Sequence, residues 1–339
     1  MIISEVSISN LRATTFNKIK FSPGINILYG NNGAGKTTIL ESIYLLSYGK
    51  SFKSPQIETI IKNTDKEAGA SLKTNTQNKL KITIFNNKKN ITRDGVKVKK
   101  ISEHFSFLPC IVSSPDEITI EGKQNTYKQK NINKGLCLIN KEFLVDLKKY
   151  NTILKQRNRA LKTGQDFKVW EEGLAICSEK IWKKREEYVL KINTKMQKIN
   201  QEEKTKINTK IEIKTPKKTT FKEALNRIIN SREKDVFTKK TTTGPHTDKI
   251  EYLINKKSIK TKASQGEKNL FFSVLKKTES DIIKKETGVH PIVLLDDIFS
   301  KLDTQNTQLV LKLFKNNPQT IITHTNKIES PTTQISIHG

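Results

Sequence analysis

Cysteine is scarce in this chain of 339 residues, and its three copies are scattered along the sequence. Cys110, Cys137 and Cys177 form no C-x-x-C pair, so the sequence indicates neither a disulfide framework nor a zinc site, and it favours a reducing compartment. Long hydrophobic runs are lacking as well, because no stretch approaches the roughly 18 apolar residues of a membrane span. We therefore expect a soluble, cytoplasmic protein without a membrane partner.

Arginine is also scarce, and it supplies only seven of the 62 basic residues. The chain has 34 acidic residues. The resulting net charge of +28 is large enough to attract a polyanion, most commonly nucleic acid. The abundance of Lys, Ile and Asn is equally consistent with a drift toward A/T-rich codons. Charge alone therefore leaves a DNA partner and a compositional bias as open alternatives.

The region around residue 30 contains a complete phosphate-binding motif. Residues 30–37 read Gly-Asn-Asn-Gly-Ala-Gly-Lys-Thr, between an apolar strand expected at 25–29 and a helix expected to begin at Thr37. Glycine lets the backbone wrap around phosphates, Lys36 reaches the β and γ phosphates, and Thr37 offers a hydroxyl to Mg²⁺. The motif predicts bound ATP and Mg²⁺. The nucleotide-binding residues expected here are Gly30, Asn31, Asn32, Gly33, Ala34, Gly35, Lys36, Thr37 and Thr38.

A second motif lies near the C-terminus, where residues 292–295 read Ile-Val-Leu-Leu and two carboxylates follow. The run is typical of a strand buried on both faces, and its end resembles a Walker B element. Asp296 is expected to hold Mg²⁺ through water, and Asp297 to orient or deprotonate the attacking water. Two acids that merely cap an ordinary strand end are the alternative.

Three further stretches complete the order of motifs that is typical of ABC-type ATPases. Ser264-Gln265-Gly266 opens a helix before the Walker B element, and Ser300 to Asp303 and then His324 come after it. In that class the signature serine contacts the γ-phosphate bound by the other subunit, so the resemblance implies a homodimer that forms on ATP binding. The residues expected to complete the site are Ser264, Gln265, Gly266, Ser300, Asp303 and the catalytic switch residue His324. A packing histidine is the alternative for His324.

The remaining pattern divides the chain into three segments. Strand signals, with a hairpin at Asp94-Gly95, dominate residues 1–112, which hold the N-terminal half of the ATPase lobe. Helical stripes dominate the insertion at 113–236, and the C-terminal half of the lobe occupies 237–339. We therefore predict an α/β fold: an ABC-type P-loop ATPase head with a mixed β-sheet and an inserted helical subdomain.

Several elements follow from the same periodicities. The insertion is expected to hold an antiparallel helical pair with its turn at 163–166, and the Lys/Asn/Thr-rich stretches 62–79 and 204–220 are interpreted as solvated loops. In the C-terminal half, the pattern predicts strands at 250–254, 292–295 and 320–323, and helices at 267–284 and 304–314.

Separate stretches from end to end of the chain resemble the RecF family, the SMC-like recombination-mediator ATPases of bacteria. They are the phosphate loop with its continuation at 40–52, Ser113-Ser114-Pro115-Asp116, Leu154–Asn158, Trp170–Glu172, Gly244-Pro245-His246, Ser264-Gln265-Gly266 and Leu294–Asp297. Two stretches depart from the family. Where the family usually has an arginine-rich run after Ser-Pro-Asp/Glu, this chain has Lys128-Gln129-Lys130-Asn131. Where the family usually has a charged Arg-Asp after Gly-Pro-His, this chain has Thr247-Asp248-Lys249. Lysine does not reproduce the bidentate geometry of a guanidinium group, so DNA or internal contacts are expected to differ there.

The resemblance implies a weak, DNA-stimulated ATPase in DNA replication and recombinational repair. Such a homodimer binds double-stranded DNA and gapped ssDNA–dsDNA junctions, works with RecO and RecR to load RecA at stalled forks, and is associated with the nucleoid. It also implies that Arg12 lies near the nucleotide, with a structural ion pair as the alternative.

Three other functions are weighed against this one. A transporter ATPase shares the motifs, but its helical subdomain is much smaller than the stretch between Lys36 and Ser264. An SMC or Rad50-type arm needs a long coiled coil with sustained heptads, which the insertion lacks. A DNA-binding scaffold with a vestigial ATPase would not need Lys36, Thr37, Asp296 and Asp297 intact.

Overall fold

The computed structural model describes residues 1–12, 14–54, 58–61, 67–86, 88–99, 104, 107–114, 124–214 and 219–338. The chain forms two compact units, the first from Met1–Thr119 and Ser264–Gly339, the second from Ile120–Ala263. Two residues of the Ser113–Asp116 stretch, Pro115 and Asp116, lie outside the described residues. Among the helices that are described, none is both long and apolar enough to cross a bilayer.

The first unit contains an antiparallel sheet of six strands in the order β2-β1-β4-β5-β6-β7. Their bounds are β1 Ile3–Leu11, β2 Thr14–Lys20, β4 Glu67–Thr74, β5 Lys79–Phe85, β6 Lys88–Arg93 and β7 Val96–Lys97. The hairpin predicted at Asp94-Gly95 is confirmed, since both residues have positive φ, as a type I′ turn requires.

Strand β4 corrects the interpretation of residues 62–79 as a solvated loop. It lies between β1 and β5, and its inward positions Ala68, Ala70, Leu72 and Thr74 are buried. The strand was missed because its inward side chains are mostly small and alternate with Gly, Ser and Lys, a composition that is also common in loops. The loop interpretation is therefore wrong for Glu67–Thr74, while residues 62–66 lie outside the described residues.

The second sheet of this unit has five strands, all parallel, in the order β14-β3-β13-β12-β8. They are β3 Gly24–Tyr29, β8 Cys110–Ser113, β12 Ile292–Leu295, β13 Gln319–His324 and β14 Thr333–Ser336. The strands predicted at 25–29, 292–295 and 320–323 are confirmed, whereas β8 and β14 were not predicted. Because parallel strands point the same way, their carboxyl ends meet at one edge of the sheet.

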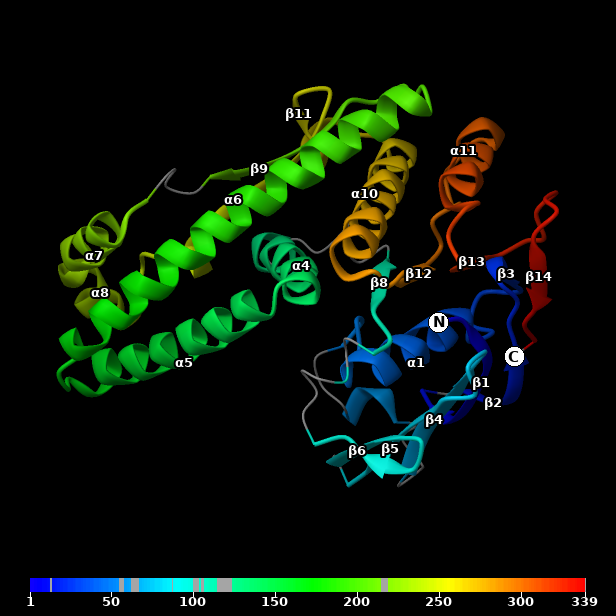
Figure 1. The fold of residues 1–339 in the computed structure, drawn as a ribbon, viewed down its shortest axis with the longest axis horizontal. Coiled ribbons are helices and arrows are strands. Elements are labelled where there is room, and N and C mark those ends of the chain that lie inside the picture. Colours follow the sequence, from blue (N-terminus) through cyan, green and yellow to red (C-terminus); the bar gives the residue numbers. More distant parts are fainter. Residues whose placement is uncertain are drawn as a thin grey trace. The chain divides into compact units, whose positions relative to one another are not determined.

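Helix α1 (Lys36–Tyr48) contacts strands of both sheets, and its buried side chains join their common apolar core. Helix α10 (Gln265–Thr287) packs against β8 and against α11 (Thr304–Phe314), as Figure 1 shows. A short 3₁₀ turn, η1, spans Glu58–Ile60. The helices predicted at 267–284 and 304–314 are confirmed.

The second unit is mainly helical. Its helices are α4 Gln124–Ile139, α5 Lys141–Thr163, η2 Lys168–Trp170, α6 Glu171–Glu202, α7 Phe221–Asn230, α8 Arg232–Thr238, η3 Pro245–Thr247 and α9 Ile259–Lys262. The predicted antiparallel pair is confirmed as α5 and α6, which lie side by side in Figure 1. Gly164 has a left-handed φ at the turn between them, where a larger side chain would be strained.

A small antiparallel sheet completes this unit, with β9 (Thr209–Lys214) and β11 (Lys257–Ser258) flanking β10 (Lys249–Ile254). Strand β9 shows that the interpretation of 204–220 as a solvated loop is wrong for these six residues, and 215–218 lie outside the described residues. The strand predicted at 250–254 exists, but it pairs with β9. By their contacts, residues 237–263 therefore belong with the helical insertion, although they were predicted as part of the ATPase lobe.

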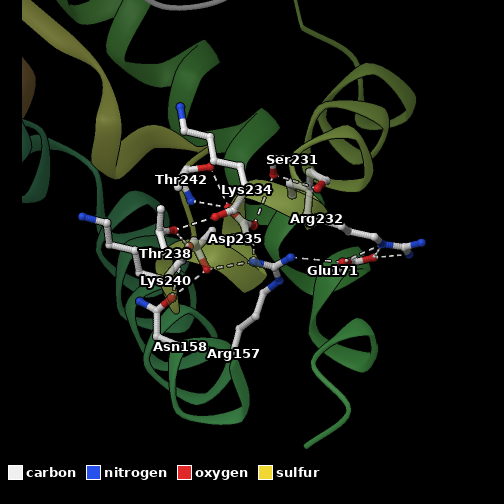
Figure 2. A network of polar contacts seen from close by, with 12 residues as sticks. Arg157, Asn158, Glu171, Ser231, Arg232, Lys234, Asp235, Thr238, Lys240 and Thr242 are labelled. Carbon is white, nitrogen blue, oxygen red and sulfur yellow. Dashed lines mark hydrogen bonds and ion pairs between the residues drawn. The ribbon is translucent and has the colours of Figure 1, made fainter. Parts of the chain in front are cut away.

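Buried ion pairs tie three helices of the second unit together (Figure 2). Arg157 of α5 is fully buried, and its Nη1 and Nη2 donate to Asp235 of α8 at 2.6 Å and Glu171 of α6 at 3.1 Å. Arg232 adds a second guanidinium on Glu171 at 2.6 Å. Buried charges require such partners, because an isolated charge in an apolar interior is very costly.

We expect Arg157→Ala to lower the free energy of unfolding of the second unit by about 3–5 kcal/mol, because it leaves two buried carboxylates without this cation. Both tryptophans of the chain, Trp170 and Trp182, lie in this unit, so their fluorescence in a urea titration reports its unfolding. Lys214→Ala removes an exposed pair with Glu251 and should leave the transition unchanged. Equal transitions for the two variants would contradict the prediction.

Candidate functional site

The phosphate loop joins the end of β3 to the start of α1, as predicted, and two of its glycines are required by close contacts. A Cβ on Gly35 would lie 2.6 Å from Thr14 Cγ2, and one on Gly30 would lie 2.2 Å from the Ile337 carbonyl oxygen. Gly35 also has a φ of +89° and precedes α1 without any side-chain cap. The first backbone N–H groups of α1 are therefore left available for an anion.

Lys36 lies over its own loop. Its Nζ donates to the carbonyl oxygens of Gly30 and Asn31, both at 2.7 Å. Burial lowers the pKa of the Lys36 ammonium, and the nearby carboxylates of Asp297 and Asp296 oppose that shift. The ammonium is thus held beside the loop by two neutral acceptors that a phosphate oxygen can replace.

Asp296 is buried at the end of β12, and two hydroxyl groups hold its carboxylate. Thr37 Oγ1 and Thr323 Oγ1 each donate to Oδ1 at 2.8 Å. Burial raises the pKa of Asp296, while these two hydrogen bonds act in the opposite direction. One carboxylate and one hydroxyl fit Mg²⁺, which prefers oxygen ligands and usually keeps waters and phosphate oxygens in its remaining positions.

Asp297 follows with a left-handed backbone, at a φ of +51°. Its N–H donates to Thr323 Oγ1 at 2.8 Å, and its carbonyl accepts from the Ser300 hydroxyl at 2.8 Å. No hydrogen bond or ion pair from the described residues engages its carboxylate, which acts on Lys36 and His324 only through its charge. The backbone is fixed and the carboxylate is left open to another group, as the predicted role requires.

His324 ends β13 and packs its ring edge-on against Phe299, with the ring centroids 5.8 Å apart. Its Nδ1 is buried and has no hydrogen-bond partner in the part of the chain that the structure describes. Burial lowers the pKa of the imidazole, which favours the neutral form. The packing alternative is thus present in the structure, and the contact of His324 with a γ-phosphate stays a prediction.

The signature residues form the start of α10. Ser264 is exposed and caps the helix: its oxygen accepts from the Glu267 N–H at 3.2 Å, so its own hydroxyl hydrogen remains free to donate. A Cβ on Gly266 would lie 2.8 Å from the Lys301 carbonyl oxygen, and Asn269 Nδ2 donates to the carbonyls of Ile298 and Ser300. The signature and the segment 298–303 are therefore packed together as one surface.

Two other predicted residues have structural partners. Asp303 caps α11 by accepting from the Asn306 N–H at 2.7 Å. Arg12 forms a bidentate ion pair with Glu41 of α1, at 2.6 and 2.9 Å, and Ser51 also donates to Glu41. The ion-pair alternative for Arg12 is thus the one seen, and nucleotide contacts of Arg12 and Asp303 stay predictions.

A cavity of about 360 Å³ opens at the strand ends. Its lining residues are Asn32, Gly33, Gly35, Lys36, Thr37, Thr38, Lys53, Asp296, Asp297, Thr323 and Thr325. Sequence reasoning missed Lys53, Thr323 and Thr325. The two threonines could have been found from the strand at 320–323, whose end must lie beside the Walker B strand, whereas Lys53 had no signal. The lining does not include Ser264, Gln265, Gly266, Ser300 or Asp303.

The stretches that depart from the RecF pattern make internal contacts within the second unit. Gln129 donates to the carbonyls of His246 and Asp248, and Lys128 donates to the carbonyl of Ile250. Arg185 Nη1 donates to Asp248 at 2.6 Å, while burial raises the pKa of Asp248 to about 6. Lys128 and Gln129 thus bind backbone carbonyls, which need no guanidinium fork, whereas Asp248 accepts from the guanidinium of Arg185.

Comparison with known proteins places nearly the whole chain in one protein family. The family model described as the RecF/RecN/SMC N terminal domain matches residues 2–335. The DNA replication and repair protein RecF of Lachnoclostridium phytofermentans is 31% identical over 96% of this chain and 93% of its own length. The RecF protein of Clostridium botulinum strain Okra is 34% identical with the same two coverages.

Solved structures agree on the fold. A structure of the recombination mediator protein RecF with ATP, from the RecFOR pathway, superposes with a TM-score of 0.87 and 27% identity, covering 99% of this chain and 95% of that one. An Smc head bound to part of ScpA shares the fold alone, with a TM-score of 0.56 and 17% identity over 100% and 94% of the two chains. The predicted ABC-type ATPase head with an inserted helical subdomain is confirmed.

We expect Thr323→Val to weaken Mg²⁺-dependent nucleotide binding about 10- to 100-fold, because the variant removes a hydroxyl that positions Asp296 and the Asp297 backbone. Losing that donor raises the pKa of Asp296 further, so binding should fail at a higher pH as the solution is acidified. Calorimetric titration with a non-hydrolysable ATP analogue, with and without Mg²⁺, measures both effects.

Thr320→Val is the matched control, since Thr320 lies on the same strand and its buried hydroxyl has no hydrogen-bond partner within the described ranges. Its Mg²⁺ dependence should equal that of the parent chain. The same Mg²⁺ affinity in both variants would rule out the positioning role of Thr323.

Proposed function

This chain belongs to the RecF family, and from that membership we propose that it is an ATP-binding protein of DNA replication and repair that works as an ATP-dependent homodimer. The dimer binds duplex DNA and gapped junctions, and acts with RecO and RecR to load RecA. Relatives of this chain are named DNA replication and repair protein RecF, and a solved RecF carries ATP.

One observation supports the proposal that the chain works as a dimer. The cavity of a single chain contains the phosphate loop and the Walker B carboxylates but no residue of the signature, although Ser264 is exposed with a free hydroxyl donor. A second copy supplies what the cavity lacks if its own signature covers the open side. Two copies related by a two-fold axis then enclose two nucleotides, each contacted by the loop of one chain and the signature of the other.

The residues of the cavity divide the work on the nucleotide. The loop glycines, the start of α1 and Lys36 bind the phosphates, and Thr37 with Asp296 holds Mg²⁺. Bound Mg²⁺ and ATP supply charge neutralisation and a cleavable phosphoanhydride. Asp297, whose backbone is fixed by Thr323 and Ser300, orients the attacking water. Turnover is slow, because fast ABC-type ATPases commonly have a glutamate at the position of Asp297. The aspartate side chain is one methylene shorter and reaches less far toward the attacking water.

Binding of ATP closes the dimer and hydrolysis releases it, so the nucleotide selects between two assemblies of different affinity for DNA. Lysine provides most of the surface charge that would meet the DNA backbone, and lysine binds phosphate as a point charge with no sequence preference. This suits a protein that binds duplex DNA and gapped junctions of any sequence.

We expect Ser264→Arg to bind ATP as the parent chain does but to stay monomeric, because an arginine at the signature blocks the partner's phosphates from approaching. Sedimentation with and without ATP measures the assembly. Thr220→Arg is the matched control, since Thr220 caps α7 with the same reciprocal Ser/Thr–Glu hydrogen bonds and is not among the residues that line the cavity. Lys36→Ala should lose ATP binding and with it the dimer. A Ser264→Arg chain that dimerises with ATP would refute the contribution of the signature in trans.

DNA affinity in the presence of ATP should fall steeply with salt, by about 0.9 log unit per log unit of salt for each phosphate neutralised. Fluorescence anisotropy with a duplex and with a gapped duplex, from low to moderate salt, measures the slope. A flat response would contradict backbone binding. If Lys36→Ala kept the full DNA affinity, the chain would instead be a scaffold with a vestigial ATPase.

A further inference from the structure

Helix α8 of the second unit presents two apolar side chains to solvent. Phe237 is 88% exposed, the highest value among the large apolar side chains of the described residues, and its neighbour Val236 is 52% exposed. Asp235, one residue earlier, is fully buried. A single exposed apolar residue is ordinary on protein surfaces. Here an aromatic ring projects from a short helix whose opposite face is held by buried charge.

The backbone that carries Phe237 is fixed by a polar network (Figure 2). The Asp235 carboxylate accepts from Arg157 at 2.6 Å and from the Thr242 N–H at 2.7 Å. Asn158 Oδ1 accepts from the N–H of Thr241 at 2.7 Å, just beyond the helix. Both sides of the turn at 238–242 are thus anchored, so the ring loses little backbone freedom when it meets a ligand.

Three lysines flank Phe237 in the sequence. Lys234 lies one turn before Phe237 on the same helix face, and Lys239 and Lys240 follow it. All three lysines are exposed, and no ion pair engages them within the part of the chain described here. Glu233 is the one exposed acid in the same stretch, whereas the charge of Arg232 is matched by Glu171. The local field therefore favours an anionic partner.

We propose that Phe237 is a stacking platform for an unpaired base of single-stranded DNA, with Lys234, Lys239 and Lys240 holding the flanking phosphates. The inference rests on the proposed DNA-binding function and adds to it a site for the single-stranded part of a gap. An exposed aromatic face stacks on a base only when that base has left the double helix, and lysines beside it bind phosphates of any sequence. A continuous duplex offers no free base face, so it gains nothing from Phe237.

The test compares Phe237→Ala with Phe85→Ala, since Phe85 is a half-exposed phenylalanine on β5 of the other unit. Fluorescence anisotropy of the full chain with ATP is measured on a thymidine oligonucleotide, a gapped duplex and an intact duplex. Phe237→Ala should weaken binding to the first two about tenfold and leave the intact duplex unchanged, while Phe85→Ala changes none. Phe237→Trp should bind the oligonucleotide and the gapped duplex as tightly as the parent chain does. The fluorescence that the added tryptophan contributes should be quenched by the oligonucleotide and not by the intact duplex.

Other outcomes overturn the inference in distinguishable ways. If the parent chain binds DNA and Phe237→Ala binds all three ligands equally well, the platform is absent while the proposed function stands, and the exposed ring then faces a protein partner. An equal loss on intact and gapped duplex would show a general effect without stacking. If the parent chain binds none of the three DNAs, the proposed function fails together with this inference.

Discussion

The candidate site depends on the parallel alignment of three strand ends. β3, β13 and β12 lie side by side in register, so the phosphate loop, Thr323 and Asp296 leave the sheet at the same edge. Thr323, at the end of the central strand, fixes the end of β12, because its hydroxyl contacts both the Asp296 carboxylate and the Asp297 backbone. Thr37 closes the arrangement from the α1 side. A shift of one residue in β13 would turn Thr323 to the other face and separate the two motifs.

The distribution of cations gives the unusual composition a structural meaning. Four of the seven arginines, Arg12, Arg157, Arg185 and Arg232, form ion pairs with carboxylates inside one unit or the other. The planar guanidinium is weakly hydrated and binds carboxylates at two points, so it tolerates burial better than an ammonium group. Lysine is left to supply the surface charge. These four arginines thus serve the architecture, and the DNA contact proposed above would fall mainly to lysine.

Sequence patterns identified most of the long elements and several strongly apolar strands, although not β8. The strand at 292–295 and the helix at 304–314 were placed to the residue, because continuous apolar runs and helical stripes leave little choice. Strands β4 and β9 were missed, since Ala68, Ala70 and Thr209 face inward although they are small or polar. Such strands exist because neighbours pair with them, and pairing partners distant in sequence are invisible in a local window.

The sequence by itself determined which chemistry the chain can perform. Phosphate loop, Walker B carboxylates and signature are local patterns, and each is imposed by the few side chains and backbone shapes that suit phosphate and Mg²⁺. Only the tertiary structure decided which of these motifs share a cavity, that Thr323 and Lys53 join them, and that Arg12 is paired with Glu41. Those facts depend on strand order and on contacts between residues far apart in the chain, which no local pattern encodes.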